Sequence, residues 1–132
     1  MKTTPCHCIT LRKATRRVSA IYDEALAPVG INIGQFSLLR NTARRAPVSL
    51  TELGTVMELD RSTIGRNTKI LERMGLVETV AGKDSREALL ALTDDGRETL
   101  AHALPLWETA QQSISEKLGS TAEQFHELLT TL

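Results

Sequence analysis

Hydrogen-bonding side chains are concentrated in one stretch near the middle of the chain. If residues 61–74 form a helix, its period of about 3.6 residues places Ile64, Thr68 and Leu71 on one side, toward a core. The other side then carries five polar residues: Ser62, Thr63, Arg66, Asn67 and Lys69. Arginine can donate a fork of hydrogen bonds to guanine, asparagine can pair with adenine, and hydroxyl groups can bond to bases or phosphates. This face favours contact with a DNA duplex, and a merely solvated helix face is the alternative.

A second group of charged residues lies in the polar stretch 81–87. Lys83 and Arg86 stand close to Gly82, in a segment whose composition is typical of a hairpin tip. A mobile tip of this kind could place a guanidinium group in the minor groove or against its phosphates. A charged turn without a partner is the alternative. The two basic features follow one another in the order that a DNA-reading helix and its neighbouring hairpin require.

The third group with potential chemistry is the triplet Cys6, His7 and Cys8, which we expect just ahead of the first helix. A tetrahedral metal site would need a further donor, such as His102 or His126, from the same chain or from a partner subunit. The two cysteines could instead form a thiol switch, or link two chains on oxidation. A frayed N-terminus with incidental cysteines is the third alternative.

The charge of the chain is balanced overall but segregated along its length. Sixteen basic residues match sixteen acidic ones, yet the net charge is +6 over residues 1–46, −2 over 47–97 and −4 over 98–132. Only four aromatic residues are present, so a surface that stacks unpaired bases is not expected. Duplex DNA is therefore the favoured nucleic-acid partner.

The elements that would position the central polar face begin with a short helix. Ser49 and Glu52 form a capping-box pattern, in which the hydroxyl and the carboxylate each satisfy an amide at the start of helix 50–57. About three residues then separate this helix from the next one. Such a short connection is typical of a helix-turn-helix.

The second helix of this pair, 61–74, has start and stop signals of its own. Asp60 has the chemistry of an N-cap, and Leu59 and Ile64 occupy the two positions of a hydrophobic staple. Gly75 is a natural C-terminal stop. The polar face described above would therefore lie on a helix with defined ends.

Two strands are expected directly after Gly75. Residues 76–80 and 88–92 flank the polar tip, and Ala88, Leu90 and Leu92 alternate with less apolar positions. Two short helices followed by a hairpin form a winged helix-turn-helix, in which the second helix enters the major groove. The predicted fold class is therefore mainly α with a small β-hairpin wing.

Longer helices precede this core. An amphipathic helix is expected over 9–27, with an apolar stripe of Leu11, Ala14, Val18, Ile21 and Ala25. A second helix over 32–44 would turn Phe36 and Leu39 inward and end before Pro47. Its tail is basic, with Arg40, Arg44 and Arg45.

Two further helices follow the hairpin. Thr93 starts a long helix that ends at Gly119, in which Pro105 should produce a kink. Its buried stripe is expected to contain Leu100, Leu104, Trp107, Ile114 and Leu118, with Trp107 as a core residue. Ser120 and Glu123 form another capping-box pattern before a final helix bearing Phe125, Leu128, Leu129 and Leu132.

The first and the last two helices carry larger apolar stripes than the small winged core can cover. Burial against a second copy of the chain would cover them, whereas capping of their own domain is the alternative. We therefore expect one domain over 1–132, with a DNA-binding core at 31–97 and dimerisation helices at 1–30 and 98–132. A two-fold dimer would place two recognition helices about one turn of DNA apart, which matches an inverted repeat.

The stretch 50–92, with the residues just after it, resembles the MarR family of bacterial regulators. The resemblance is carried by Leu53-Gly54, Leu59-Asp60-Arg61-Ser62-Thr63, Leu71-Glu72-Arg73-Met74-Gly75-Leu76-Val77, Asp84-Ser85-Arg86 and Leu92-Thr93-Asp94-Asp95-Gly96. It extends to nearly the whole chain, because the family holds its DNA-binding core between N- and C-terminal dimerisation helices.

The resemblance implies a homodimer that represses or activates transcription at a pseudo-palindromic operator, with release by a small ligand or by cysteine oxidation. It implies that Ser62, Thr63, Arg66 and Asn67 lie on the recognition helix. It also implies that Asp84 and Arg86 lie on the wing, where the aspartate would orient the arginine. Gly65 inside the recognition helix and the short C-terminus depart from the pattern.

Other functional classes fit the sequence less well. No glycine loop for phosphates and no pair of carboxylates at a catalytic spacing is present, so we expect neither an enzyme nor a cofactor. Without a long apolar run or a secretory signal in residues 1–10, we expect a cytoplasmic protein with no membrane partner. No clear binding box identifies a small-molecule effector. The remaining alternative is a helical protein-interaction module that does not bind DNA.

Overall fold

The computed structural model describes residues 3–84 and 86–132. Its elements, in chain order, are α1 (His7–Leu26), a 3-10 turn (Ala27–Val29), α2 (Ile33–Arg45), α3 (Leu50–Met57), α4 (Arg61–Arg73), β1 (Val77–Ala81), β2 (Ala88–Leu92), α5 (Asp94–Leu118), a second 3-10 turn (Gly119–Thr121) and α6 (Ala122–Thr130). The predicted mainly α fold with one hairpin is confirmed. Across the described residues, none of the helices has the length and apolar character needed to span a membrane.

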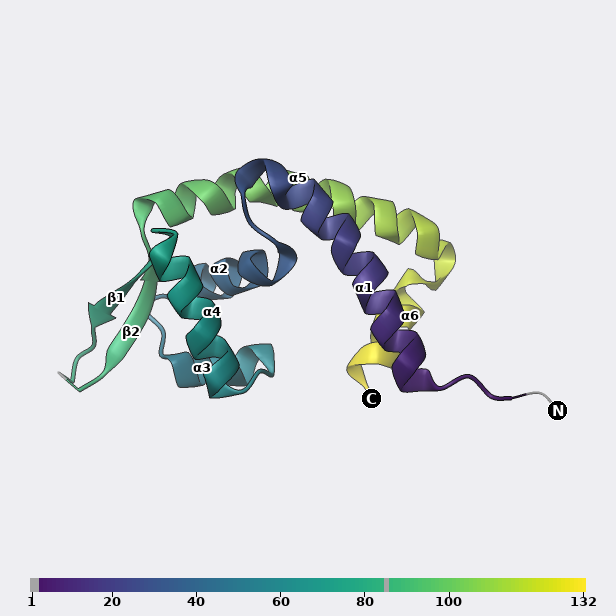
Figure 1. The fold of residues 1–132 in the computed structure, drawn as a ribbon, viewed down its shortest axis with the longest axis horizontal. Helices are drawn as coiled ribbons and strands as arrows, with labels where there is room; N and C mark the ends of the chain where they lie inside the picture. Colours follow the sequence, from purple (N-terminus) through teal and green to yellow (C-terminus); the bar gives the residue numbers. More distant parts are fainter. Residues whose placement is uncertain (1–2, 85) are drawn as a thin grey trace.

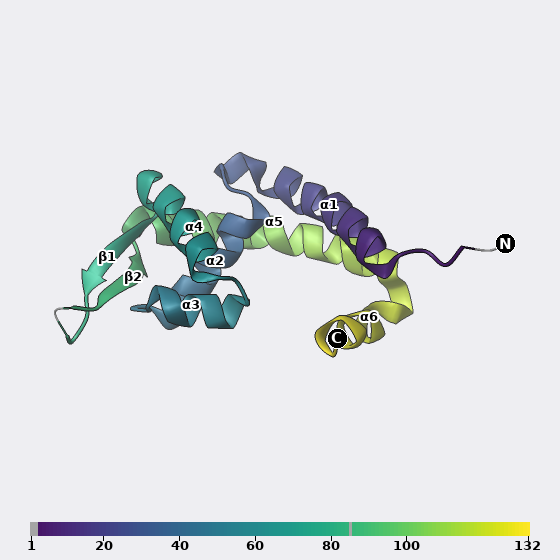
Figure 2. The same ribbon diagram turned by 60° about the horizontal axis from the view of Figure 1, so that its bottom comes forward.

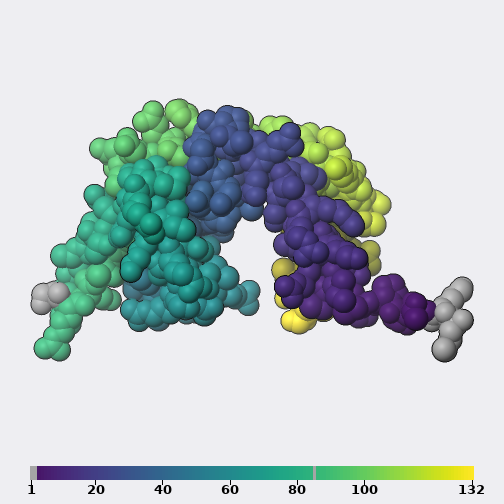
Figure 3. All heavy atoms as spheres, viewed as in Figure 1, coloured from purple at the N-terminus to yellow at the C-terminus, as the bar shows by residue number. Residues whose placement is uncertain are grey.

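The chain is shaped like an arch (Figure 1). Helices α2, α3 and α4 gather with the hairpin at one end, α1 and α6 form the other end, and α5 runs along the top between them. The space-filling view shows an open hollow between α3 and the N-terminal half of α1 (Figure 3). The predicted dimerisation segments 1–30 and 98–132 therefore form one end and the top of the arch, and α2, α3, α4 and the hairpin lie at the other end.

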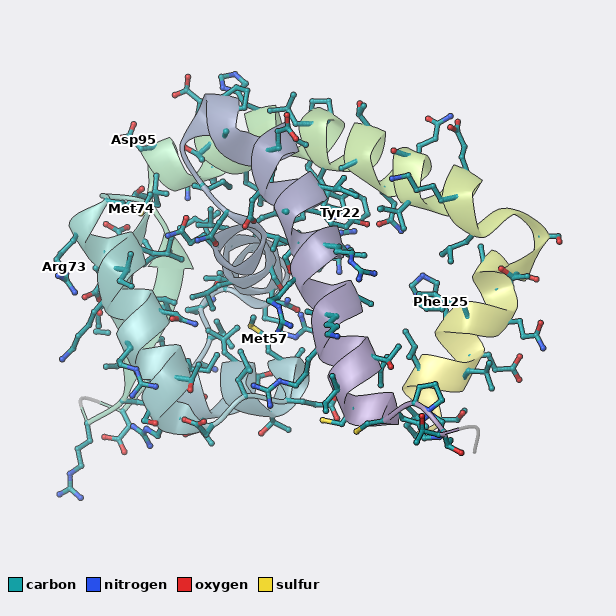
Figure 4. The ribbon with its side chains drawn as sticks, turned by 45° about the vertical axis from the view of Figure 1, so that its right-hand side comes forward. Tyr22, Met57, Arg73, Met74, Asp95 and Phe125 are labelled. Carbon is teal, nitrogen blue, oxygen red and sulfur yellow. The ribbon has the colours of Figure 1, made fainter. Side chains whose placement is uncertain are left out.

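Helix α1 lies along α5, as two views show (Figures 1 and 2). The Tyr22 hydroxyl of α1 donates a hydrogen bond to Gln111 Oε1 of α5, and burial raises the pKa of Tyr22. Asp23 Oδ1 accepts a hydrogen bond from the amide of Ile33 over 2.8 Å, which ties α1 to the start of α2. Figure 4 shows Tyr22 between the two long helices.

Helix α2 is the central helix of the core. Its start is a complete capping box, because Asn32 Oδ1 accepts from the Gln35 amide over 2.9 Å and Gln35 Oε1 accepts from the Asn32 amide over 3.0 Å. This capping box was not predicted from the sequence. Phe36 and Leu39 are buried as predicted.

The start of α3 differs in one detail from the prediction. Ser49 Oγ accepts a hydrogen bond from the Glu52 amide over 3.1 Å, but the hydrogen bonds of the described residues include none from the Ser49 amide to the Glu52 side chain. Half of the predicted capping box is therefore present. At Gly54 an added Cβ would stand 3.0 Å from the Leu59 carbonyl oxygen, so the tight turn between α3 and α4 favours glycine there.

The hairpin pairs β1 with β2 in an antiparallel register that runs from Val77 opposite Leu92 to Ala81 opposite Ala88. The first strand begins one residue later than predicted, because the Leu76 amide still bonds to the Leu71 carbonyl over 3.0 Å at the helix end. Val48 exchanges two backbone hydrogen bonds with Leu90, of 3.1 and 2.7 Å. The wing is thereby fixed to the segment just before α3.

Two glycines and a threonine join the end of α4 to the start of α5. Gly75 has a φ of +77°, a left-handed conformation that suits the C-terminal stop predicted there. Thr93 Oγ1 accepts from the Gly96 amide over 3.0 Å and donates to the Gly75 carbonyl over 2.6 Å. A Cβ at Gly96 would overlap the Leu76 carbonyl oxygen, so only glycine permits this approach.

Helix α5 continues through Pro105 and is arched in Figure 1. The predicted capping box of the last helix is wrong. Residues Gly119–Thr121 form a 3-10 turn, and Thr121, in the right-handed helical region, precedes α6 without a side-chain cap. The chain passes from one helix into the next almost without leaving helical geometry, so Ser120 has no extended N-cap position to occupy.

The buried core lies at the end of the arch that carries the hairpin, between α2, α3, α4, β2 and the first half of α5. Its largest fully buried side chains are Leu26, Phe36, Leu38, Leu39, Val48, Leu53, Ile64 and Leu71. The Thr42 hydroxyl is also buried and donates to the Leu38 carbonyl over 2.7 Å. The core therefore supports α4 from behind and leaves its other side exposed.

Candidate nucleic-acid interface

Helix α4 presents the polar face that its periodicity predicts. Ile64 and Leu71 are fully buried and Thr68 is 4% exposed, so these three residues form the core side. On the outward side, Ser62, Arg66, Asn67 and Lys69 are exposed and Thr63 is half-buried. The structure therefore brings the five predicted polar residues together on one accessible helix face.

Two further arginines of α4 belong to this exposed surface and were not among the predicted site residues. Arg61 Nη1 lies 3.4 Å from Thr51 Oγ1 of α3, so it spans the two helices at the start of α4. Arg73 lies in the last turn, where it points away from the body of the molecule (Figure 4). A count of all exposed cations on the predicted helix would have found both.

The first turn of α4 contains a dense hydrogen-bond network around Asp60. Its Oδ1 accepts from the Thr63 amide over 2.8 Å and from Ser62 Oγ over 2.6 Å. Its Oδ2 accepts from Thr63 Oγ1 over 3.0 Å. These bonds from Ser62 and Thr63, together with the nearby charge of Arg66, lower the pKa of Asp60 to about 2. The predicted N-cap thus also orders two of the predicted DNA-contacting hydroxyls.

The wing projects beyond the helices at the edge of α4 (Figure 1). Lys83, Asp84 and Arg86 are all exposed at its tip, whereas Ser85 lies outside the described residues. Thr79 Oγ1 of β1 donates to Glu72 Oε1 of α4 over 3.0 Å, which fixes the wing beside this helix. Both predicted basic features therefore lie on neighbouring parts of one end of the molecule.

The predicted contact between Asp84 and the Arg86 side chain takes another form in the structure. Asp84 Oδ1 accepts from the backbone amide of Arg86 over 3.1 Å, and the Asp84 carbonyl accepts from the Glu87 amide over 2.9 Å. These are bonds of a side-chain-capped turn. Asp84 therefore shapes the tip and leaves the guanidinium of Arg86 exposed to solvent.

Arg40, which the sequence assigned to the basic tail of a helix, packs against aromatic rings. The rings of Phe36 and Trp107 stack with centroids 5.7 Å apart, and Arg40 Cζ lies 4.7 Å from the Trp107 centroid. This cation–π contact joins α2 to α5. Trp107, half-buried in this stack, is a core residue as predicted.

The opposite end of the arch exposes apolar side chains. In α1, Ile9 is 55% exposed and Leu11 is 40% exposed; in α6, Leu128 is 60% exposed. Val18, Phe125 and Leu129 add to this surface. We call these six residues the apolar end. Their exposure is unfavourable for a chain that stays alone in water.

The cysteine triplet lies at the start of α1. The helix begins at His7, so only Cys6 precedes it, which corrects the prediction that all three residues stand ahead of the helix. Both thiols are free and exposed. Among the residues that the structure describes, no group of three or more histidine, cysteine, aspartate or glutamate residues could hold a metal ion. Neither His102 nor His126 completes a site with the triplet inside one chain.

Comparison with known proteins places this geometry in a family. A model described as MarR family matches residues 29–87. An uncharacterized HTH-type transcriptional regulator of Bacillus subtilis (strain 168), YwoH, is 28% identical over 85 residues, which are 64% of this chain and 62% of that relative. The alignment therefore spans less than two thirds of the relative's length.

Solved structures match over nearly the full length. The M. tuberculosis transcriptional regulator MosR in complex with DNA is 32% identical, with a TM-score of 0.85 over 96% of this chain and 93% of that one. The transcriptional repressor CouR, bound to a 23-mer DNA duplex, is 29% identical with a TM-score of 0.86 over 96% and 91%. With this identity and coverage, the chain belongs to the MarR family of transcriptional regulators.

Proposed function

We propose that this protein is a homodimeric repressor that binds a pseudo-palindromic operator in double-stranded DNA. The observation that carries the proposal is the exposed polar face of α4, fixed by a hydrogen bond from Thr79 to Glu72 beside a basic hairpin tip. A recognition helix and a wing in this arrangement can contact both grooves of one half-site. The DNA-bound structures of MosR and CouR support it.

Each part of the face has a role that its chemistry suits. Arg66 and Asn67 would read base edges in the major groove, with Ser62 and Thr63 at the start of the helix. Lys69 would neutralise phosphates. Lys83 and Arg86 would reach the minor groove or its phosphates, and Asp84 would hold the turn that presents them.

The apolar end supports the second half of the proposal, the homodimer. Residues 1–30 and 98–132 would pair with a second copy and bury the exposed side chains of α1 and α6. Residues 31–97 would form the DNA-binding core within the single domain 1–132. Each subunit carries one exposed polar face of α4, which we call the reading face. A two-fold dimer would therefore recognise an inverted repeat.

Release from the operator would be the regulated step. Oxidation of Cys6 and Cys8 is one route. It is supported by the exposure of both thiols at the start of α1, which belongs to the apolar end. Binding of a small ligand is the other route. The regulator as proposed acts by binding alone, so it needs neither a cofactor nor a catalytic residue.

The deciding experiment is a selection of random duplex DNA against the purified chain, with and without reductant. Enrichment of an inverted repeat, bound by a dimer in sedimentation analysis, is the expected result. A loss of binding without reductant, restored by replacing Cys6 and Cys8 with serine, would support the thiol route. If no sequence is enriched at low salt in either redox state, the protein is better described as a helical protein-interaction module.

A further inference from the structure

The network at the start of α4 restricts what two of its hydroxyl groups can do. Ser62 Oγ and Thr63 Oγ1 both donate to the Asp60 carboxylate, over 2.6 and 3.0 Å. A carboxylate accepts hydrogen bonds and cannot donate them, so the single proton of each hydroxyl is committed to Asp60. Toward any further partner, both side chains therefore offer only lone pairs.

This restriction separates the possible DNA partners into two groups. Phosphate oxygens, guanine N7 and O6, and thymine O4 are acceptors, so they cannot bond to a hydroxyl that has already given its proton away. The amino groups of adenine and cytosine are the donors in the major groove. A hydroxyl held by Asp60 is therefore matched to adenine or cytosine.

Ser62 is better placed than Thr63 to make this contact. Ser62 is exposed, and its contact with Asp60 is its one side-chain hydrogen bond among the described residues. Thr63 is half-buried, and its Oγ1 also lies 3.4 Å from Arg66 Nη2, which uses a lone pair. The 2.6 Å distance from Ser62 Oγ to Asp60 is in the range of charge-assisted hydrogen bonds, which resist rotation of the hydroxyl.

We propose that Asp60 is a positioning residue for base recognition, which fixes the Ser62 hydroxyl as an acceptor and so selects adenine or cytosine at one position of each half-site. Every base pair carries one amino group in the major groove, on one of its strands. The contact therefore reads which strand holds the amino group. The inference rests on the proposed function, because it requires α4 to lie in the major groove.

The test compares four proteins in the same selection from random duplex DNA: the wild type, Asp60→Gly, Ser62→Ala and the double variant. Glycine is tolerated at the N-cap at little cost to the stability of a helix, so α4 should still form. It has no side chain that could accept the Ser62 or Thr63 proton, whereas the amide oxygen of an asparagine could still accept from Ser62. In Asp60→Gly the Ser62 hydroxyl is then able to turn and donate to a base.

The wild type should enrich adenine or cytosine over guanine or thymine at the Ser62 position, by about five- to tenfold. Asp60→Gly and Ser62→Ala should each remove most of this preference. The double variant should lose no more than Ser62→Ala alone, because Asp60 acts through Ser62. The control Ser49→Asn changes the N-cap of α3, and it should leave the preference at this position unchanged.

Two results would overturn the inference while leaving the proposed function intact. In the first, Asp60→Gly keeps the wild-type preference at an otherwise enriched inverted repeat. In the second, Asp60→Gly changes the preference as strongly in the Ser62→Ala background, which would make Asp60 itself the base contact. A wild type that enriches no sequence would overturn the proposed function and this inference together.

Discussion

The first turn of α4 and the helix α6 differ in how much of their bonding is complete within one chain. At α4, the Asp60 carboxylate accepts three hydrogen bonds from its own neighbours, and the core supports the helix from behind. At α6, Leu128 is 60% exposed and the helix has no buried residue. The first turn of α4 is therefore organised within a single chain and without DNA. The apolar end, in contrast, requires a second copy of the chain to cover it.

The sharpest test of this contrast is to place a charge on the apolar end. Leu128→Asp should separate the dimer, because a carboxylate would have to be buried between the two copies. Without the second reading face, affinity for the operator should fall by about a hundredfold or more. Sedimentation equilibrium and fluorescence anisotropy with the selected operator measure the two effects.

A matched control exists on the same helix. Thr130→Asp adds the same charge at a position away from the face that Phe125, Leu128 and Leu129 share, so the dimer should persist. A Leu128→Asp protein that remains dimeric and binds with full affinity would show that the apolar end is not the interface.

The next largest effect is expected on the reading face. Arg66→Ala should weaken binding to the operator by about 1 to 3 kcal/mol and relax the preference at one base position of each half-site. The protein should remain dimeric and unfold at an unchanged temperature, since Arg66 is exposed. Lys117→Ala, an exposed cation of α5 outside the reading face, serves as control. An Arg66→Ala protein that keeps the wild-type affinity and the wild-type base preference would contradict the role of Arg66.

A weaker and less selective effect is expected at the wing. Arg86→Ala should reduce affinity for all duplexes to a similar degree and make the salt dependence shallower, by about one unit in the slope of log K against log salt. Titrations at several salt concentrations, with operator and random duplexes, provide the measurement. A loss confined to the operator would assign Arg86 to base reading instead.

The smallest effect concerns the cap itself. Because the pKa of Asp60 is lowered to about 2, its contribution to stability is complete above the unfolded value of 3.8 and is lost as the pH falls through about 2. Ser62→Ala removes the largest cause of this shift, so the pKa of Asp60 should rise toward 3.8. A carboxyl titration followed by NMR measures both values. Identical midpoints in the two proteins would mean that Ser62 does not bond to Asp60 in solution.

The sequence predicted correctly those features that depend on interactions between residues close together in the chain. The bounds of α3 and the start of α4 were predicted well, because Ser49 and Asp60 cap their helices through bonds to residues three positions away. The same reasoning failed at Ser120, since the 3-10 turn before α6 removes the extended conformation that a cap requires. Local signals are reliable only where the backbone geometry they assume is present.

The candidate site shows the same limit. Periodicity was sufficient to place Ser62, Arg66 and Asn67 on the outer side of α4. The buried residues of this helix recur every three to four positions, as one face of a helix requires. It could not show that Arg40 packs on Trp107, a residue 67 positions away, or that Asp84 bonds to a backbone amide rather than to a guanidinium. These contacts depend on tertiary structure and on the path of a turn.

The junction between Gly75, Leu76 and Gly96 has a mechanical consequence. Gly96 packs closely against the Leu76 carbonyl, and Thr93 bonds to the Gly75 carbonyl, so the end of α4 and the start of α5 are joined at one point. The DNA-binding core and the long helix would therefore turn as one lever. With a rise of about 1.5 Å per residue, the 25 residues of α5 make an arm of about 37 Å. A tilt of α5 by about 3° about its far end would displace the DNA-binding core by roughly 2 Å. In a dimer, such a tilt would change the distance between the two DNA-binding cores, and so whether this distance matches one helical turn of B-form DNA.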